Sequence, residues 1–565
     1  MGHACLKVIG GKGQNNSHRV LVIGLDSASP FLIEKWKEEL PNLRGMMARG
    51  TYGKLASVIP PESCPAWNCF ATGKNPAKLG VFHFLNLTGK GEIQIVDSSS
   101  TQAANPIWEI IGRKDMRSVV LTVPGTYPPF PLNGVMVSGF PTPFSSEYTY
   151  PAGLRKELDD LVGGYEVDVI ATAPGQMKGG EGAYLREVER VHEKTLKAAM
   201  HLIHNQQWNL FLVVFRALDL VQHHFWAHME KGEKNPAEPY GDVIKNWYVR
   251  ADRTVGALLQ EVGDDAWVFV ISDHGAGLAD GYFHLNELLR QVGLLTVTRK
   301  LDGQGRGLSH RWRSYAVRHI SPDLARTLKP IIPSSLFVKL SDRRARTTQI
   351  QTLLESIDWP KTKAFGIGGE TFRVYVNRKS FWNRGIVEQV EASGVSQGII
   401  DELHKVEKVV GGLSFNIYKK SENYSGPFLE QAPDLCVEAF YGGAKCQTGF
   451  SVGHGEILGD SEASYSGRHL RDGVWFLTGP GVNQGRSFDA SLLDICPTIL
   501  CLLGTEIPSD IDGKVLQDAF APELMKSRKI LTVSLGREEG AQGHVFTPEE
   551  EEEIKRRLAG LGYLE

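Results

Sequence analysis

The sequence predicts an α/β fold built on a large, mostly parallel sheet with helices on both faces. Short apolar and β-branched runs alternate with longer helical patterns along most of the chain, which is typical of strand and helix units in such sheets. The 42% of hydrophobic residues, set against 22% of charged residues, supplies enough apolar material for a packed core. We therefore expect one large globular domain that carries an insertion.

Individual elements follow from the same patterns. Apolar clusters predict strands at 19–25, 117–123, 209–215, 266–272 and 473–478. A recurrent apolar stripe predicts one long amphipathic helix over 181–206. A further strand-like run lies at 371–376. The segment 547–561 opens with Pro and Glu and closes with Lys and Arg, as helix ends prefer, and predicts a C-terminal helix.

Changes in composition divide the chain into four parts. We expect a flexible leader at 1–18 and a core formed by 19–285 together with 431–530. An insertion or cap at 286–430 interrupts the strand and helix rhythm, and a tail with a helix follows at 531–565. The insertion contains an arginine-rich stretch, 306–346, which would either steer an anionic substrate or form a solvated helical surface.

Composition also limits the partners and the compartment. The 62 basic and 65 acidic residues give a net charge of −3, so we expect no nucleic-acid binding. No run of 18 apolar residues occurs, and we expect no association with a membrane. The seven cysteines are scattered without a C-x-x-C pair, which favours reduced thiols in a cytoplasmic protein. The sequence makes no prediction of the oligomeric state.

Acidic residues follow three of the predicted strands. Asp26 comes directly after the first strand, Asp219 lies four residues after the strand at 209–215, and Asp273 follows the strand at 266–272. The carboxyl ends of parallel strands meet at one edge of the sheet, where such sheets bind ligands. Carboxylates gathered there would repel one another unless cations lie between them.

Histidines beside these acids indicate which cations. His223 follows Asp219 by four residues, so both side chains share one face of a helix that starts after the strand. His274 follows Asp273 directly. Mixed imidazole and carboxylate ligands suit zinc, with manganese or iron as alternatives, whereas magnesium and calcium prefer oxygen alone. The pattern favours zinc.

A candidate nucleophile lies in the segment 60–73. Pro65 is expected at the first position of a helix, which places Ser63 at its N-terminal end, where free N–H groups favour anions. A serine oxygen there can be held by a metal and aimed at a phosphate. The plainer interpretation is that Ser63 only caps the helix. Cys64 is a competing nucleophile, but a thiolate beside zinc would bind the metal instead.

The chain resembles the alkaline phosphatase superfamily, and within it the type I phosphodiesterase/nucleotide pyrophosphatase-like phosphohydrolases and phosphomutases. The resemblance extends from about residue 19 to beyond 520 and implies an alkaline phosphatase-like sheet. The segments that carry it are 22–26, 63–65 with 71–76, 219–223 and 272–275.

The resemblance implies two divalent metal ions, most often zinc. It assigns Asp26, Asp273, His274 and the Ser63 oxygen to one ion, and Asp219, His223 and a late histidine to the other. Two residues compete for the last place. His469 lies ten residues before Gly479, which is the family spacing and makes it the preferred ligand. His454, in a Gly-His-Gly segment, is the alternative metal-binding or substrate-binding residue.

The implied activity is metal-dependent hydrolysis of a small-molecule phosphate ester, either a monoester or a diester. Ser63 would attack phosphorus and form a phosphoseryl intermediate, which water then cleaves. Two alternatives remain open at this point. A phosphomutase would use the same residues and return the phosphoryl group to its substrate, and a non-catalytic binding protein would keep the fold without turnover.

Overall fold

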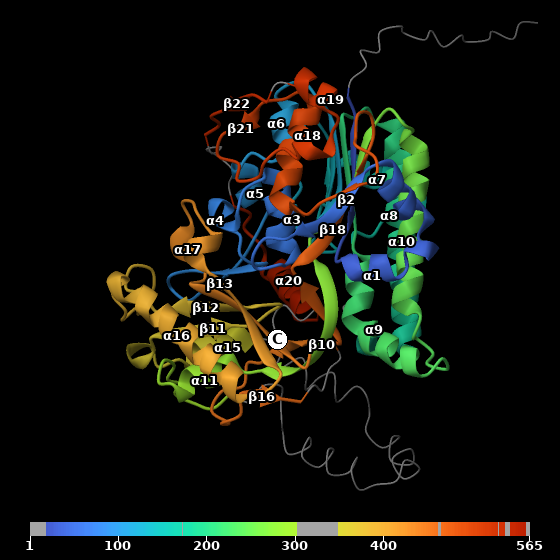
Figure 1. The fold of residues 1–565 in the computed structure, drawn as a ribbon. Helices are drawn as coiled ribbons and strands as arrows, with labels where there is room; N and C mark the ends of the chain where they lie inside the picture. Colours follow the sequence, from blue (N-terminus) through green and yellow to red (C-terminus); the bar gives the residue numbers. More distant parts are fainter. Residues whose placement is uncertain are drawn as a thin grey trace, which may run out of the picture.

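The computed structural model describes residues 18–171, 173–301, 349–460, 465–528, 530–536 and 543–560. Two sheets dominate these residues, a ten-stranded one and an eight-stranded one (Figure 1). The predicted leader, apart from residue 18, and the arginine-rich stretch 306–346 lie outside the described residues.

The larger sheet is mostly parallel, as predicted. Its strand order is β19-β2-β18-β9-β1-β8-β5-β6-β7, with β20 beside β2. The five central strands β9, β1, β8, β5 and β6 run parallel to one another, whereas β18 runs antiparallel to both of its neighbours. The bounds are β1 Val20–Leu25, β2 Thr51–Ala56, β5 Ser118–Val123, β6 Gly134–Ser138, β7 Thr149–Tyr150, β8 Leu210–Phe215, β9 Trp267–Ile271, β18 Asp472–Thr478, β19 Arg486–Ser487 and β20 Ala490–Ser491.

Helices cover both faces of this sheet, with α8, α9 and α10 on one side and α3, α6 and α18 on the other (Figure 1). Strands β1, β5 and β8 are buried along their whole length, which explains their continuous apolar sequences. The bounds are α1 Pro30–Lys35, α2 Pro41–Arg49, α3 Ser63–Thr72, α6 Ile107–Gly112, α7 Gly153–Val162, α8 Gly180–Asn205, α9 Ala217–Lys234, α10 Val243–Val262, α18 Ile495–Leu503 and α19 Pro522–Ser527. The five predicted strands and the long predicted helix are confirmed.

A second sheet lies beside the first and was not predicted as such. Its strands follow the order β11-β12-β14-β15-β10-β16, with β13 beside β14 and β17 beside β10. The bounds are β10 Gly275–Phe283, β11 Ala364–Ile367, β12 Phe372–Val376, β13 Leu413–Lys419, β14 Leu435–Tyr441, β15 Ala444–Thr448, β16 Leu458–Gly459 and β17 Gly467–Leu470. Helices α11 Leu285–Gln291, α15 Gln349–Ser356 and α16 Gln389–Val409 accompany it, and α20 Pro548–Gly560 confirms the predicted C-terminal helix.

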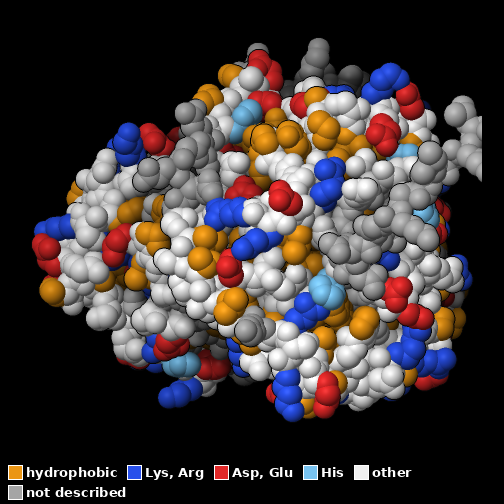
Figure 2. Space-filling view, turned by 90° about the horizontal axis from the view of Figure 1, so that it is seen from above, with side chains coloured by type: hydrophobic (Ala, Val, Ile, Leu, Met, Phe, Trp, Pro, Cys, Tyr) orange, Lys and Arg blue, Asp and Glu red, His pale blue; other side chains and the backbone are white. Residues whose placement is uncertain are grey.

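The surface carries charges of both signs. Figure 2 shows Lys and Arg side chains interspersed with Asp and Glu over the described part of one face, with hydrophobic groups between them. This mixture agrees with the net charge of −3. Among the described helices, none has the length and apolar content needed to cross a bilayer.

Candidate metal and phosphoryl-transfer site

The three acid-bearing strand ends meet at one edge of the larger sheet. Strand β1 lies between β8 and β9 and pairs with both in parallel, so that Leu25 is opposite Phe215 and Gly24 is opposite Ile271. The residues that follow each strand are therefore neighbours. Asp273 Oδ1 accepts a hydrogen bond from the Ser27 N–H at 3.2 Å, next to Asp26.

Helix α9 aligns Asp219 with His223, as their spacing predicted. The helix begins at Ala217, directly after β8, and the two residues lie one turn apart. The His223 Nε2 atom is 3.2 Å from Asp219 Oδ1. Both side chains are buried, so this pair faces the interior of the site.

Ser63 opens helix α3 at the centre of the site. Its Oγ atom lies 3.4 Å from Asp26 Oδ1 and 3.3 Å from His274 Nε2. The expected helix start is wrong in detail, because Pro65 is the third helical residue and Glu62 occupies the N-cap. Ser63 is the first residue of the helix, so its hydroxyl still lies at the N-terminal end. Ser63 is therefore not the N-cap residue of α3.

The late histidine at the site is His469. Its Nε2 atom lies 3.1 Å from Asp219 Oδ1 and 3.2 Å from His223 Nε2, on strand β17. His454 is instead exposed, and its Nε2 atom contacts the Leu301 carbonyl oxygen at 2.9 Å. The structure therefore brings His469, and not His454, to the predicted ligands.

Main-chain carbonyl groups orient all three histidines. The Nδ1 atoms of His223, His274 and His469 lie 2.9, 3.1 and 3.0 Å from the carbonyl oxygens of Gly467, Gly275 and Pro61, respectively. A carbonyl oxygen can only accept a hydrogen bond, so each Nδ1 carries the proton. Each Nε2 therefore faces the centre, where it would bind a metal ion after release of any proton that it donates to a neighbouring carboxylate.

Burial and mutual repulsion strongly perturb the carboxylates. Burial, followed by the charge of Asp219, raises the pKa of Asp26 to about 8, and burial with the charges of Asp26 and Asp219 raises the pKa of Asp273 well above its usual value. Burial also opposes ionisation of Asp219, but attraction and hydrogen bonds from His223 and His469 outweigh it and hold its pKa well below the usual value. Such crowding is the arrangement that bound cations relieve.

The donor set fits divalent cations. Three groups of side chains place ligand atoms within 4.8 Å of one another: Asp26 with Asp273 and His274, Asp219 with His274 and His469, and His223 with Glu370 and His469. The Asp273 Oδ2 atom is buried and accepts no hydrogen bond from the described residues. Converging imidazole nitrogens and a carboxylate oxygen without a donor are what a metal ion would satisfy.

Several residues of the site escaped sequence reasoning. Trp67 donates its Nε1–H to Asp26 Oδ2 at 3.3 Å, one turn into α3. Glu370, from the loop between β11 and β12, accepts a hydrogen bond from the His469 N–H at 2.9 Å. Arg216 stands at the end of β8, beside two of the acids. Arg216 directly follows strand β8, and this position after a strand is the same sequence signal that indicated the site aspartates.

The neighbouring histidines contact other groups. His224 packs against the rings of Tyr184 and Tyr465, and His228 Nδ1 lies 2.5 Å from Glu238 Oε1. Neither belongs to the groups of ligand atoms found among the described residues.

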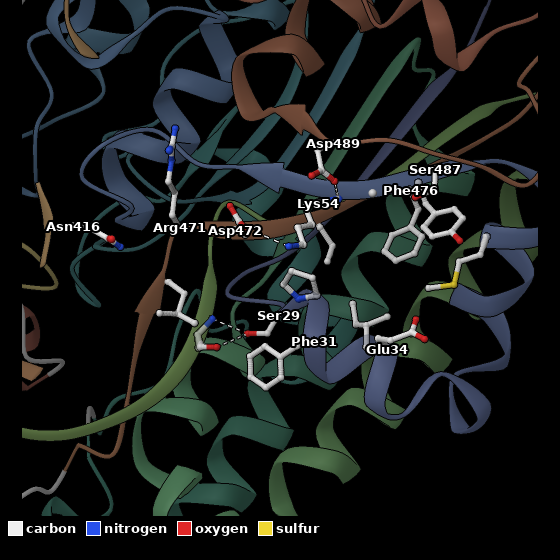
Figure 3. A pocket seen from close by; sticks show the side chains of 18 of the residues that line it. Ser29, Phe31, Glu34, Lys54, Asn416, Arg471, Asp472, Phe476, Ser487 and Asp489 are labelled. Atoms are coloured by element: carbon white, nitrogen blue, oxygen red, sulfur yellow. Dashed lines mark hydrogen bonds and ion pairs between the residues drawn. The ribbon is translucent and has the colours of Figure 1, made fainter. Parts of the chain in front are cut away.

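A separate cleft of about 700 Å³ lies between the edge of the larger sheet and the second sheet (Figure 3). Its lining includes Phe31, Lys54 and Arg471. The Ser29 Oγ–H donates to the Ala276 carbonyl oxygen at 2.7 Å on its wall. The predicted metal ligands do not line this cleft, which distinguishes it from the site above.

Comparison with known proteins assigns the family. The model of the type I phosphodiesterase/nucleotide pyrophosphatase family matches residues 20–347, more than half of the chain. The chain belongs to this family. It is therefore a hydrolase of the phosphodiesterase class in the alkaline phosphatase superfamily, and metal dependence is typical of its relatives. No curated protein has a sequence that matches this chain.

Solved structures similar to this family member include ectonucleotide pyrophosphatase/phosphodiesterase 5 from human and mouse. The human protein has a TM-score of 0.47 at 13% identity, and the murine protein has a TM-score of 0.47 at 12% identity. An inactive murine variant in complex with AMP has a TM-score of 0.46 at 12% identity. Each comparison covers 89% of this chain and 100% of the other chain.

Proposed function

We propose that this family member is a metal-dependent hydrolase of small-molecule phosphate esters that uses Ser63 as its nucleophile. The observation that carries the proposal is the position of the Ser63 Oγ, within 3.4 Å of both Asp26 and His274 at the first residue of α3. A hydroxyl in a group of metal-ligand atoms is placed for activation, which a simple helix cap does not require.

The proposed ligand sets are those that the sequence implied. Asp26, Asp273, His274 and Ser63 would hold one divalent cation, and Asp219, His223 and His469 would hold the other. Mixed nitrogen and oxygen donors favour zinc, with manganese as the alternative. Bound cations would supply Lewis-acid stabilisation of the phosphoryl oxygens and lower the pKa of the serine hydroxyl.

The protein's own groups position the reaction. The Ser63 Oγ would form a bond to phosphorus while the bond from phosphorus to the leaving oxygen breaks, which gives a phosphoseryl ester. Water then attacks phosphorus, releases phosphate or a phosphomonoester, and restores the hydroxyl. Free N–H groups in the first turn of α3 would favour the anionic phosphoryl group beside Ser63.

Cys64 is a poor competitor for this role. Its side chain is completely buried, and burial raises the pKa of its thiol well above the usual value. A thiol in that state is not a nucleophile, because the thiolate is the reactive form. Ser63 is equally buried, but its Oγ lies beside Asp26 and His274, so the raised pKa of the thiol supports Ser63 as the attacking group.

The proposal is tested with p-nitrophenyl phosphate and bis-p-nitrophenyl phosphate, assayed with Zn²⁺ or Mn²⁺. Wild type should release p-nitrophenol from at least one ester, and Ser63→Ala should lower kcat by about 10³-fold or more while the protein keeps most of its metal. Elemental analysis gives the metal content. A folded, metal-loaded wild type without ester hydrolysis would leave a mutase or a binding protein, and an active Ser63→Ala would exclude the serine nucleophile.

A further inference from the structure

Asp26 and Asp219, two of the proposed metal ligands, each direct one carboxylate oxygen toward the centre and the other toward Arg216. Oδ1 of Asp26 lies 3.4 Å from Ser63 Oγ, and Oδ1 of Asp219 lies 3.1 Å from His469 Nε2, so both Oδ1 atoms face the centre. Both Oδ2 atoms face Arg216, with Asp26 Oδ2 at 3.9 Å from its Nε and Asp219 Oδ2 at 3.5 Å from its Nη2. One guanidinium therefore spans the outer oxygens of two ligands that belong to different proposed ions.

A third carboxylate, that of Asp168, fixes Arg216 by a hydrogen bond. Asp168 Oδ2 accepts a hydrogen bond from Arg216 Nη1 at 2.6 Å, and the same oxygen accepts one from Arg557 Nη2 at 2.8 Å. Both guanidinium groups also lie over the ring of Phe140, at 4.1 and 5.1 Å from its centroid. Asp168 is 3% exposed and Arg557 is 2% exposed, so water screens this arrangement little.

Arg557 comes from the C-terminal helix α20, 389 residues away from Asp168 in the sequence. Its Nη1 donates to the Thr142 carbonyl oxygen at 2.6 Å, so both arms of the guanidinium fork are engaged. The same helix is anchored elsewhere, because Glu550 Oε1 accepts hydrogen bonds from the Tyr127 and Ser146 hydroxyl groups, both at 2.8 Å. Ile554 and Leu558, on the inner face of α20, are fully buried.

We propose that Arg557 is a positioning residue of the metal centre. Through Asp168 it fixes Arg216, whose positive charge lies at ion-pair distance from the outer oxygens of Asp26 and Asp219 and attracts them, so that their inner oxygens face the proposed ions. The inference rests on the proposed metal-dependent function and extends it to a helix that the catalytic motifs do not include. Partners that orient ligating carboxylates typically contribute 10- to 100-fold to metal affinity or activity.

The fork geometry explains why arginine is required at this position. A guanidinium can bind Asp168 and the Thr142 carbonyl oxygen at the same time, whereas an ammonium group of similar charge lacks the planar fork. Arg557→Lys therefore keeps the charge and removes the geometry. Asp168→Asn keeps the shape and removes the charge that fixes both arginines.

The experiment titrates metal-free protein with Zn²⁺ by calorimetry and then measures kcat and KM on the p-nitrophenyl esters. Arg557→Lys and Asp168→Asn should each weaken Zn²⁺ binding by about tenfold or more, and the double variant should be no weaker than the worse single variant. Glu550→Ala, which removes the acceptor of two hydrogen bonds on the same helix away from Arg557, is the matched control and should bind Zn²⁺ like wild type. Circular dichroism confirms that each variant is folded.

The outcomes separate this inference from the proposed function. Wild-type Zn²⁺ affinity in folded Arg557→Lys and Asp168→Asn, or additive losses in the double variant, would overturn the positioning role alone. An equal loss in Glu550→Ala would also overturn it, because the helix would then act only through stability. A wild type that binds no divalent metal would instead overturn the proposed function.

Discussion

At the scale of single residues, the three histidines of the centre are held by main-chain carbonyl groups. Such partners do not change when neighbouring side chains are substituted, so the Nε2 atoms keep their direction. His454 serves as a control for substitution of His469, because His454 is exposed and lies outside the groups of candidate ligand atoms.

We expect His469→Ala to lower kcat/KM by about 100-fold or more, because it removes a ligand and leaves Asp219 without one of its two histidine partners. His454→Ala should stay within about twofold of wild type, as surface substitutions usually do. Steady-state kinetics on the p-nitrophenyl esters measure both. The reverse ranking would assign the late ligand to His454.

A second prediction concerns the carboxylates. Asp219→Asn and Asp273→Asn should each lower the bound metal by about one ion per chain, because each change removes one carboxylate charge from a proposed ligand set. Elemental analysis after gel filtration measures the loss. Asp160→Asn, at a side chain that is 68% exposed, is the control and should keep the full metal content. Unchanged metal in both site variants would contradict the assigned ligands.

At the scale of elements, the contact between β1 and α3 sets the position of the nucleophile helix. Gly24 leaves room for Trp67, because a Cβ atom at Gly24 would lie 2.5 Å from Trp67 Cη2 and 2.9 Å from Val214 Cγ2. Trp67 in turn donates to Asp26 Oδ2. The missing side chain on β1 therefore lets α3 approach the ligand that follows the strand.

Gly24→Ala should therefore displace Trp67 and lower both stability and activity. Overpacking of a buried contact typically costs about 1–3 kcal/mol of unfolding free energy. Gly45→Ala, on the surface of α2, meets only the Arg49 Nη2 atom at 3.8 Å and should be neutral or stabilising. Urea unfolding and ester hydrolysis test the pair. Wild-type stability in Gly24→Ala would show that the contact between β1 and Trp67 can accommodate a methyl group.

At the scale of the whole molecule, the centre joins the two sheets. Asp26, Asp219 and Asp273 follow strands of the larger sheet, whereas His469 lies on β17 and Glu370 between β11 and β12 of the second sheet. Metal binding would therefore link the stability of both parts. A ligand at 1,000 times its dissociation constant stabilises the folded state by about 4 kcal/mol.

Removal of metal with a chelator should accordingly lower the unfolding temperature of wild type by several degrees. The same treatment should change the unfolding temperature of the Asp219→Asn/Asp273→Asn double variant little, because that protein holds little metal to lose. Calorimetry with and without chelator measures the two shifts. Equal shifts in the two proteins would show that the chelator acts elsewhere.

The sequence predicts those site residues whose position depends only on a neighbouring strand or helical turn. Asp26 follows a buried strand directly and Asp273 follows one after a single residue, and Asp219 with His223 needs only one helical turn. Glu370 and Arg557 could not be found in this way, because only tertiary contacts connect them to the site, Glu370 through His469 and Arg557 through Asp168, and no motif spacing marks them. The second sheet was missed for a related reason, since its strands come from distant segments of the chain.

Strand β10 begins directly after His274 and continues into the second sheet, and Ala276 on it pairs with His469 on β17. The two imidazole rings stack with centroids 3.7 Å apart. Any displacement of the second sheet relative to the larger sheet would therefore reach both rings together, because β10 and β17 are paired beside them. With Mn²⁺ in both proposed sites, the magnetic coupling between the two ions would report such a displacement.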